Sequence, residues 1–519
     1  MAKKEPFFTE PTLAMQIQAS LQELLKKQTD VLLQKGEDHP GAVRSLQGLL
    51  HGLGYSNELK WEAYRADGDY GGGTTTALQA FQRANGLPGD GTQLDPLTLQ
   101  KLLDRYALLP LLREVKKARE SNQLAALFAG PAGANKAAQL QKAAGISFAA
   151  SVPTTSETDQ ALAALEPGYG KDWQTSNLED DSTPDLTVET QSNRYIVGDA
   201  WVRVKFNRKD KGVWTIGSDT PLAFIQANTE KLMASGLTES DIRVITPVSA
   251  NEGNLNAINS WDNCYLTFGM FQWTLGVGSG KGELPALLLR IKNDEPEAFQ
   301  QYFGQYGIDL VDTNKTTGYL SLNGEKISSS AAKEKFRKGP EWAFRFWRAG
   351  LDDRVKFVQI AHALDRINSF WHSDDYRPLN KFYISDLVTS EYGICLLLDH
   401  HVNRPGHLAS YAIGKKDIIG QALKQAGLAN TSPASWGTTE ENQLLAAYLP
   451  LRAASSMTHG RERAAKIKNY LDKGRLSGER FSYQPAPAAV QSRSLDAPAE
   501  AGYGPINFSE YTRRKRVRD

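Results

Sequence analysis

Residues 249–274 carry the side chains in this sequence that are best suited to acid–base chemistry. Glu252 precedes Gly253, and Asp262 and Thr267 follow before a run of aromatic residues and glycine. A glutamate near the end of a helix, followed by a short β-like segment with aromatics, suits general acid catalysis on a sugar, because apolar walls raise the pKa of the acid. A second polar group nearby then serves a water molecule or the developing cation.

The spacing of Glu252, Asp262 and Thr267 ahead of Gly269 resembles the active-site run of phage-type lysozymes. Residues 268–273, Phe-Gly-Met-Phe-Gln-Trp, are similar to the Gly-Leu-Met-Gln signature of lytic transglycosylases and goose-type lysozymes, which belong to the same superfamily. The resemblance implies that Glu252 is the general acid, that Asp262 stabilises the oxocarbenium-like transition state or holds water, and that Thr267 positions that water.

The resemblance does not decide between a hydrolysis product and an anhydro sugar. If Asp262 points away, Glu252 acts alone as acid and then base, and the product is the intramolecular anhydro sugar of a lytic transglycosylase. Neither route needs a cofactor, and we expect none.

Other polar and aromatic side chains are candidates for binding the substrate. Aromatic residues near Glu252, including Trp261, are more often core than sugar platforms, but one or two in a saccharide cleft would stack on pyranose rings. Asp399 precedes His400 and His401, with His407 nearby; this is either a metal site or a polar cluster at a helix end, and no second cluster at zinc spacing accompanies it. We therefore predict no metal, and we predict as substrate-binding residues Tyr265, Phe271, Gln272, Trp273, Asp399 and Asn403.

The elements that must position these groups are mostly helices. Residues 201–206 alternate as a strand and are followed by a turn and a returning strand at 213–217, which predicts a hairpin. Thr220 begins a helix through Leu232, and Thr238 with Asp241 forms a capping box for the helix that leads to Glu252. Further helical patterns cover 283–303, 331–350, 353–369, 383–402 and 415–427. The predicted fold class is mainly α with a small β element, and the resemblance places an α+β lysozyme-like domain at 196–430.

A second unit lies at residues 41–103. Its first helix turns apolar residues inward and ends at Gly54, its second holds Leu78 and Phe81, and its third is capped by Asp95 with Pro96 at the first position. Three short helices joined by Asp-Gly turns predict a small bundle, and nothing in that geometry is catalytic.

The glycine turns of this bundle carry a second resemblance. Residues 67–71 (Asp-Gly-Asp-Tyr-Gly), Phe81-Gln82 and Asp90-Gly91 are similar to the three-helix peptidoglycan-binding domain found at the ends of wall hydrolases. The resemblance implies a peptidoglycan-binding domain at 38–110, with binding residues Asp67, Asp69, Tyr70, Phe81 and Gln82. The aspartates have a plainer interpretation as turn formers, whereas Tyr70 and its neighbours are expected to line a muropeptide groove.

The remaining segments connect or extend these units. Within 1–37, residues 12–34 predict one amphipathic helix, which either packs internally or attaches the chain to a larger particle. Residues 111–195 are helical at first and then, from 151 to 193, rich in Pro, Thr, Ser and Asp, which predicts an extended linker that keeps the catalytic module near its polymer. Residues 431–519 predict a helical extension whose basic tail is either a solvated end or a polyanion contact.

Composition and charge exclude some classes of function. The 519 residues include 60 basic and 59 acidic side chains, so no net charge drives the chain toward nucleic acid or membrane. Cys264 and Cys395 form no CxxC motif, and neither a signal peptide nor an 18-residue apolar run is visible. We therefore expect synthesis in the cytoplasm, and action at the bacterial cell wall or periplasm after lysis or dedicated delivery.

Together these patterns predict a peptidoglycan glycosidase of the muramidase type, anchored to the wall by its amino-terminal module. Two alternatives remain open. One is a chitosanase-like glycosidase on a related fold. The other is a non-enzymatic wall-binding component of a phage tail or contractile injection particle.

Overall fold

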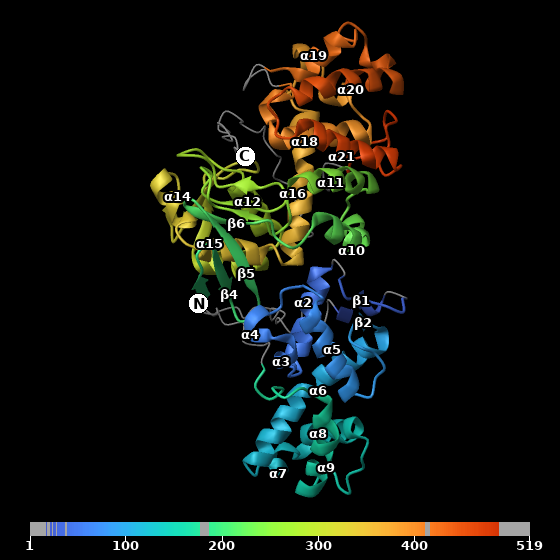
Figure 1. Ribbon diagram of the computed structural model, residues 1–519, viewed down its shortest axis with the longest axis vertical. Coiled ribbons are helices and arrows are strands. Elements are labelled where there is room, and N and C mark those ends of the chain that lie inside the picture. The colour runs from blue at the N-terminus through green and yellow to red at the C-terminus, as the bar shows by residue number, and fades with distance from the viewer. Residues whose placement is uncertain are drawn as a thin grey trace. The chain divides into compact units, whose positions relative to one another are not determined.

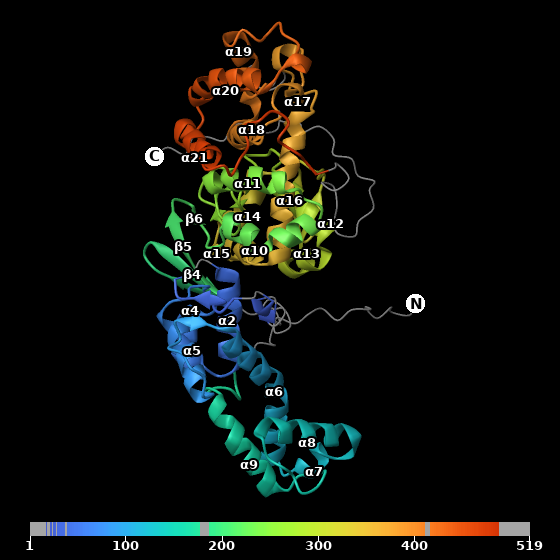
Figure 2. The same ribbon diagram turned by 90° about the vertical axis from the view of Figure 1, so that its right-hand side faces the viewer.

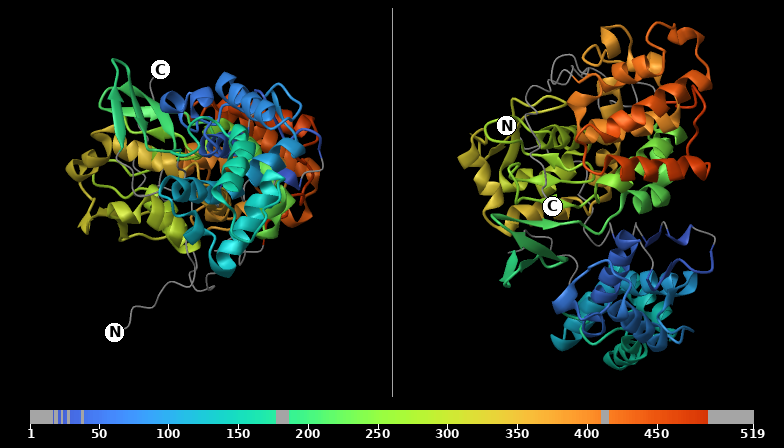
Figure 3. Two further views of the ribbon diagram at one scale, coloured as in Figure 1. Left: turned by 90° about the horizontal axis from the view of Figure 1, so that it is seen from below. Right: turned by 45° about the horizontal axis from the view of Figure 1, so that its top comes forward.

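The computed structural model describes residues 39–176, 186–409 and 416–486, with shorter pieces at 17, 21–22, 24–26 and 29–36. The chain divides into two compact units, Met1–Val188 with Ile196–Val204 and Glu189–Tyr195 with Lys205–Asp519. Helices account for 55% of the structure and strands for 10%, which confirms the predicted mainly helical class. The first unit runs from blue to teal and the second is mainly green to red (Figure 1), and Figure 3 shows both from two further directions.

The first unit contains the predicted three-helix bundle. Its three main helices bury Val43, Leu46, Leu78 and Phe81 completely. Asp95 caps the third helix by accepting a hydrogen bond from the Thr98 backbone N at 2.8 Å. Its elements are β1 (Leu33–Gln34), α2 (Pro40–Gly52), α3 (Ser56–Leu59), α4 (Trp61–Tyr64), α5 (Gly72–Ala84), β2 (Gln93–Leu94), α6 (Pro96–Glu120), α7 (Leu124–Leu127), α8 (Gly130–Ala144), α9 (Thr155–Leu165) and the 3-10 turn η1 (Glu166–Gly168).

The predicted linker is folded over its first half. Thr154 and Glu157 form a reciprocal capping box that begins α9, and Leu162 and Leu165 on this helix are buried. Trp173, farther along, is also buried, and its carbonyl accepts two hydrogen bonds from Arg113 of α6, at 3.0 and 2.7 Å. The prediction of an extended segment from 151 to 193 is therefore wrong up to residue 176, because apolar residues at helical spacing outweigh the linker-like composition.

The predicted helix at 12–34 lies largely outside the described residues. Ile17, Leu21 and Leu24 are buried where they are described. Leu33 and Gln34 instead form β1, which pairs antiparallel with β2. The helix therefore ends before residue 33.

The second unit contains a small antiparallel sheet. Some of its strands come before the helix that ends at Glu252 in the sequence, and others come after it. The predicted hairpin is confirmed, since Asn207 lies opposite Trp214 in the pairing of its two strands. The sheet continues in the order β5 (Arg203–Lys209), β6 (Gly212–Thr215), β7 (Ile258–Asn259), β8 (Thr267–Phe268) and β9 (Trp273–Thr274). β3 (Thr187–Thr190) and β4 (Arg194–Gly198) precede β5 in the strand order of this sheet, and a separate sheet contains β10 (Ile308–Val311), β11 (Tyr319–Leu322) and β12 (Glu325–Lys326).

Helices form the rest of the second unit (Figure 2). Three predicted long helices are each divided in two. Those at 283–303 and 331–350 break at Glu295 and at Gly339, because a proline follows and starts a new helix. The one at 383–402 is interrupted at residues 388–390. The helices are α10 (Pro221–Ala234), α11 (Glu239–Glu252), α12 (Leu284–Asp294), α13 (Pro296–Tyr302), α14 (Ser330–Arg337), α15 (Pro340–Ala349), α16 (Asp353–Trp371), α17 (Ile384–Leu387), α18 (Glu391–Asn403), α19 (Ile418–Gln425), α20 (Thr438–Ala453) and α21 (Gly460–Asp472), with 3-10 turns η2 (Gly304–Tyr306), η3 (Pro378–Asn380), η4 (Pro405–His407) and η5 (Pro433–Ser435).

The carboxy-terminal helices belong to the same unit as α11. α21 packs against both α11 and α18, and α20 packs against α19. The boundary predicted at residue 430 therefore does not separate an extension from the rest of this unit. The basic tail beyond it lies outside the described residues.

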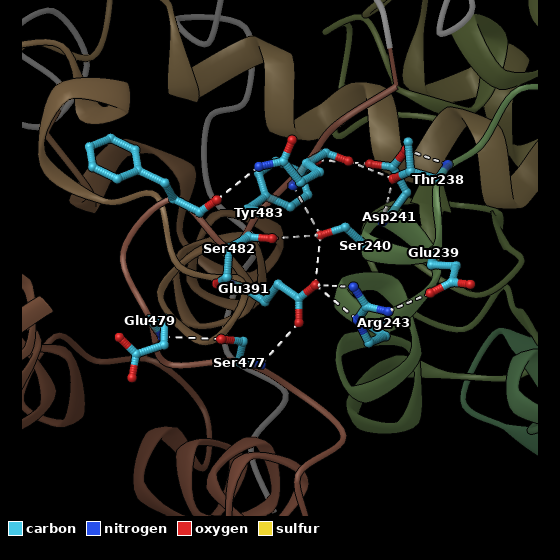
Figure 4. Close-up of polar contacts among 12 residues, drawn as sticks. Thr238, Glu239, Ser240, Asp241, Arg243, Glu391, Ser477, Glu479, Ser482 and Tyr483 are labelled. Atoms are coloured by element: carbon cyan, nitrogen blue, oxygen red, sulfur yellow. Dashed lines mark hydrogen bonds and ion pairs between the residues drawn. The ribbon is translucent and has the colours of Figure 1, made fainter.

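Residues 477–486 form a strap across the amino-terminal ends of α11 and α18 (Figure 4). The buried Glu391 carboxylate accepts hydrogen bonds from Ser240 Oγ at 2.7 Å and from the Ser477 backbone N at 2.9 Å, and it pairs with Arg243. Tyr483 Oη donates to Asp241 Oδ1 at 3.0 Å. The strap thus fixes the start of the helix whose other end carries Glu252.

Candidate active site

The helix that carries Glu252 is defined at both ends. Thr238 and Asp241 form the predicted capping box at its start. Glu252 is its last residue, and Gly253 continues in an extended conformation. The side chain of Glu252 lies outside the described part of the structure, so its position is given by the backbone and by its neighbours.

A buried charge cluster holds the last turn of α11. Arg463 of α21 donates from Nη1 to the carbonyl of Asn251 at 2.8 Å and pairs through Nη2 with Asp399 Oδ1 at 2.6 Å. Asn251 Nδ2 donates to the same Asp399 oxygen at 3.2 Å, and Arg452 of α20 pairs with the other oxygen. Because Asp399 is completely buried, it is a positioning group for α11 and not the predicted contact with substrate.

Asn403 lies one turn beyond Asp399 at the end of α18. Its Nδ2 donates to the Asp399 carbonyl at 3.3 Å, and the side chain is half-buried. The structure therefore gives Asn403 a contact within its own helix.

Gln359 of α16 joins the segment after Glu252 to the glycine-aromatic loop. Its Nε2 donates to the Leu255 carbonyl at 2.9 Å, and its Oε1 accepts from the Met270 backbone N at 3.2 Å. Gly269 has a φ of 79°, and a Cβ there would lie 2.3 Å from Gln359 Oε1, so only glycine fits. The sequence carried no signal for Gln359, because it is one polar residue among many on a long helix.

Asp262 and Thr267 lie in the hairpin that follows Glu252. Asp262 Oδ1 accepts from the Cys264 backbone N at 2.9 Å, and Oδ2 accepts from Asn259 Nδ2 at 3.0 Å. Asn259 is the residue opposite Thr267 in the pairing of β7 with β8. The structure therefore brings these two predicted residues into one local unit.

Two buried polar atoms, one on the residue before Glu252 and one in the hairpin after it, have no hydrogen-bond partner among the described residues. They are Thr267 Oγ1 on β8 and Asn251 Oδ1 on α11. Buried polar groups in proteins are almost always satisfied, so an unsatisfied one calls for an explanation such as local strain, a bound water or ion, or a functional role. Thr267 is 4% exposed, so a water bound to its hydroxyl would be shielded from bulk solvent.

Most of the aromatic candidates belong to the core. Phe271 and Trp273 are buried with their rings 5.8 Å apart, and Trp273 lies 5.5 Å from His362. Tyr265 is 8% exposed with the Arg337 guanidinium 4.5 Å from its ring. These three side chains are accounted for by packing, in place of the predicted stacking on sugars.

Gln272 and Trp261 are more open. Gln272 has a φ of 52°, and its Nε2 lies 3.8 Å from where a Cβ on Gly253 would be, so its amide is beside the end of α11. Trp261 is half-buried, with Lys209 Nζ 3.7 Å from its ring centre. Gln272, one of the predicted substrate contacts, therefore has its amide beside Gly253, the residue after Glu252.

The histidines after Asp399 are core residues. His400 contacts Tyr448 Oη at 2.6 Å, and His401 accepts from Arg366 Nε at 3.0 Å. Burial holds the pKa of both imidazoles well below 6.5, so both are neutral. In the part of the chain that the structure describes, no three His, Cys, Asp or Glu side chains are grouped to hold a metal ion.

In the first unit the predicted binding residues form the turns and the core of the bundle. Asp67 Oδ1 accepts from Gln47 Nε2 at 2.7 Å and from the Asp69 backbone N at 3.0 Å, and burial raises its pKa. Tyr70 is 1% exposed and donates to the Gly91 carbonyl at 2.9 Å.

Phe81 and Gln82 of α5 are buried as well. Gln82 Oε1 accepts from the Gly91 backbone N at 3.0 Å, which fixes the second glycine turn. The structure thus favours the plainer role of the motif in turn formation, and it buries Tyr70, Phe81 and Gln82 inside the bundle.

Comparison with known proteins identifies one module. Residues 39–102 match the family model of the peptidoglycan binding domain. We found no match to the chain among curated proteins and none among solved structures. The resemblance of the bundle is therefore confirmed, and it supports association with the cell wall. No helix within the described ranges is both long and apolar enough to cross a membrane.

Proposed function

We propose that this chain is a glycosidase that cleaves peptidoglycan between its amino sugars, brought to its polymer by the module at 39–102. The observation that carries the proposal is the local arrangement around the end of α11. The helix ends at Glu252, and the hairpin that follows holds the Asp262 carboxylate and the buried hydroxyl of Thr267, which has no hydrogen-bond partner among the described residues. A general acid, a fixed second carboxylate and a water-binding group are the parts that glycoside cleavage requires.

In the proposed mechanism Glu252 protonates the glycosidic oxygen. Asp262 has a donor on each carboxylate oxygen, from Cys264 and Asn259, which supports a fixed electrostatic role and disfavours a nucleophilic one. Thr267 would hold the attacking water through its buried hydroxyl. Without that water, Glu252 would act as acid and then base and yield the anhydro product.

The wall-binding module supports peptidoglycan as the polymer over chitosan. It acts by proximity, because tethering a catalytic site near its substrate raises the effective concentration without any new contact. Action at the wall would follow release by lysis or delivery by a phage tail or injection particle.

One observation favours a second candidate, a wall-binding protein without catalysis. Tyr265, Phe271, Trp273 and Asp399, four of the residues expected to contact sugar, are buried. Clearing of turbid suspensions of purified walls separates the candidates: an enzyme clears them in proportion to its concentration, whereas a binder sediments with them and leaves turbidity unchanged. Clearing of chitosan instead of walls would support the chitosanase-like alternative.

A further inference from the structure

A pocket of about 420 Å³ lies in the first unit, apart from the turn motif that identifies the binding module. It is lined by the end of α2, the α3–α4 junction and residues 172–176, with His51, Lys60, Trp61, Glu62, Asp172 and Thr175 among its walls. Residues 172–176 lie beyond the 39–102 match to the family. This volume is in the range of pockets that hold small ligands.

The segment from 172 to 176 is firmly joined to the bundle. The Asp172 backbone N donates to the Gly54 carbonyl at 3.3 Å, and Ser176 Oγ donates to the Gly52 carbonyl at 3.2 Å. Gly54 has a φ of 91°, and a Cβ there would lie 2.3 Å from the Trp173 backbone N. The close approach that this glycine permits completes the wall of the pocket.

Two unpaired charges of opposite sign line the pocket. Within the described residues neither the Lys60 ammonium nor the Asp172 carboxylate has an ion-pair or hydrogen-bond partner, and the two do not pair with each other. Glu62, by contrast, is bonded by Arg65 at 3.0 and 2.9 Å. Lys60 and Asp172 are therefore available to a ligand that carries both a carboxylate and an ammonium group.

The backbone fixes the place of Lys60. Its φ is 54°, in the left-handed region that lysine rarely adopts, because it ends α3 and begins α4. Such strained positions cluster at ligand sites.

The aromatic part of the pocket does not provide a platform for a sugar. Trp61 is 3% exposed, and His51 covers one face of it, with ring centres 3.9 Å apart and planes 5° from parallel. Trp201 packs against Trp61 edge-on at 6.0 Å. A pyranose therefore has no open tryptophan face to stack on.

We propose that this pocket binds the zwitterionic end of a peptidoglycan stem peptide, with Lys60 receiving its carboxylate and Asp172 its ammonium group. The proposal rests on the wall-binding part of the proposed function. The N-acetylated sugars of a glycan strand carry no ammonium group, so they cannot form an ion pair with Asp172. A stem peptide that ends in a free diamino acid offers both charges.

The test is titration calorimetry of the full chain with a soluble tripeptide ending in diaminopimelate. The tripeptide with its amines acetylated, the tripeptide with its carboxylates amidated, and an N-acetylated disaccharide serve as comparisons. Lys60→Gln and Asp172→Asn should each weaken binding of the free tripeptide about tenfold or more, because each removes a charge-assisted hydrogen bond. Lys60→Gln should have no further effect on the amidated peptide, nor Asp172→Asn on the acetylated one.

Matched controls are Lys142→Gln on α8 and Glu120→Gln on α6, both exposed and outside the pocket, and neither should change the affinity. A wild-type chain that fails to bind the free tripeptide, binds the disaccharide in a Lys60-dependent way, or is unaffected by both pocket variants overturns the proposal. Sedimentation with whole walls, measured in parallel, reports wall binding separately. A chain that sediments but does not bind the tripeptide would support wall association and overturn the proposed role of the pocket. A chain that fails to sediment contradicts the wall-binding part of the proposed function.

Discussion

Arg463 donates a hydrogen bond of 2.8 Å to the backbone carbonyl of Asn251, the residue before Glu252. The contact joins α21 to the last turn of α11 across 212 positions of sequence. The carboxy-terminal helices therefore help to set where the proposed catalytic glutamate lies. Asp399 completes this arrangement, because it binds Arg463, Arg452 and the Asn251 side chain at once.

Replacing Asp399 should destabilise the second unit strongly. Asp399→Asn leaves the buried Arg452 and the half-buried Arg463 without their carboxylate, and breaking a buried pair by removing one partner costs about 3–5 kcal/mol. Urea unfolding of the full chain measures this loss. The exposed Asp472 of α21, paired with Lys468, is the matched control, and Asp472→Asn should cost at most about 1 kcal/mol. Equal midpoints for the two variants would contradict the positioning role of Asp399.

Gln359→Met should show whether Gln359 positions the proposed active site in addition to stabilising the fold. The change keeps the volume but leaves the Leu255 carbonyl and the Met270 N–H without their partner, at a cost of about 1–3 kcal/mol for each buried group. The rate of wall clearing, assayed well below the melting temperature, should decrease by more than the loss of folded protein explains. The reason is that the segments at Leu255 and Met270 lose the side chain that joins them. Gln421→Met, on the exposed face of α19, should change neither stability nor clearing. Full clearing by folded Gln359→Met protein would show that this contact does not position the site.

The wall-binding unit should need residues beyond the bundle. Tyr55 Oη donates to the Gly168 carbonyl at 3.2 Å, and Trp201 packs on Trp61, so a fragment that ends at 110 cuts α6 and loses both contacts. A fragment of residues 39–204 should sediment with purified peptidoglycan and melt higher than one of residues 39–110. Deleting 39–102 from the chain should lower activity on intact walls far more than on soluble fragments. A 39–110 fragment that melts as high as 39–204 would limit the unit to the bundle.

Mild acid should destabilise the second unit through its buried histidines. Burial lowers the pKa of His362 to about 3 and holds those of His400 and His401 well below 6.5. Between pH 6.5 and these folded values the unfolded chain binds protons that the folded chain does not, so stability falls as pH falls. Each histidine contributes on the order of 1.4 kcal/mol per pH unit in this window.

Urea unfolding at pH 7.5, 6 and 5 measures this dependence. In His362→Leu the free energy of unfolding should depend less steeply on pH, by the equivalent of about one proton. The reason is that position 362 no longer takes up a proton on unfolding. An unchanged slope in that variant would contradict the assignment of His362 as a buried neutral group.

Local signals in the sequence predicted much of the fold. The Asp95-Pro96 start of α6, the Thr238–Asp241 capping box and the 201–217 hairpin are contained within a few residues, and the structure has all three. At 151–176 the Ser, Thr and Pro content predicts a linker, but the helical spacing of Ala161, Leu162 and Leu165 determines the structure.

The candidate site was less predictable for a physical reason. Its motif residues are close in sequence, but the groups that hold them come from far away, as Gln359 and Arg463 do. A motif also cannot separate a residue that contacts a ligand from one that stabilises a turn, and Tyr70 and Gln82 both hydrogen-bond to the turn at Gly91.

The central claim is that Glu252 cleaves glycosidic bonds of peptidoglycan, and mass spectrometry of muropeptides released from purified walls tests it most directly. Glu252→Gln keeps the size of the side chain but removes the transferable proton, so release should fall by about 10²–10⁴ while the melting temperature stays near that of the wild type. Asp262→Asn should cost a comparable amount if the products have reducing ends, and less if they are anhydro sugars. The account predicts muropeptides cut between the amino sugars by the wild type and almost none by Glu252→Gln. Equal release by both proteins, or none by the wild type, would contradict it.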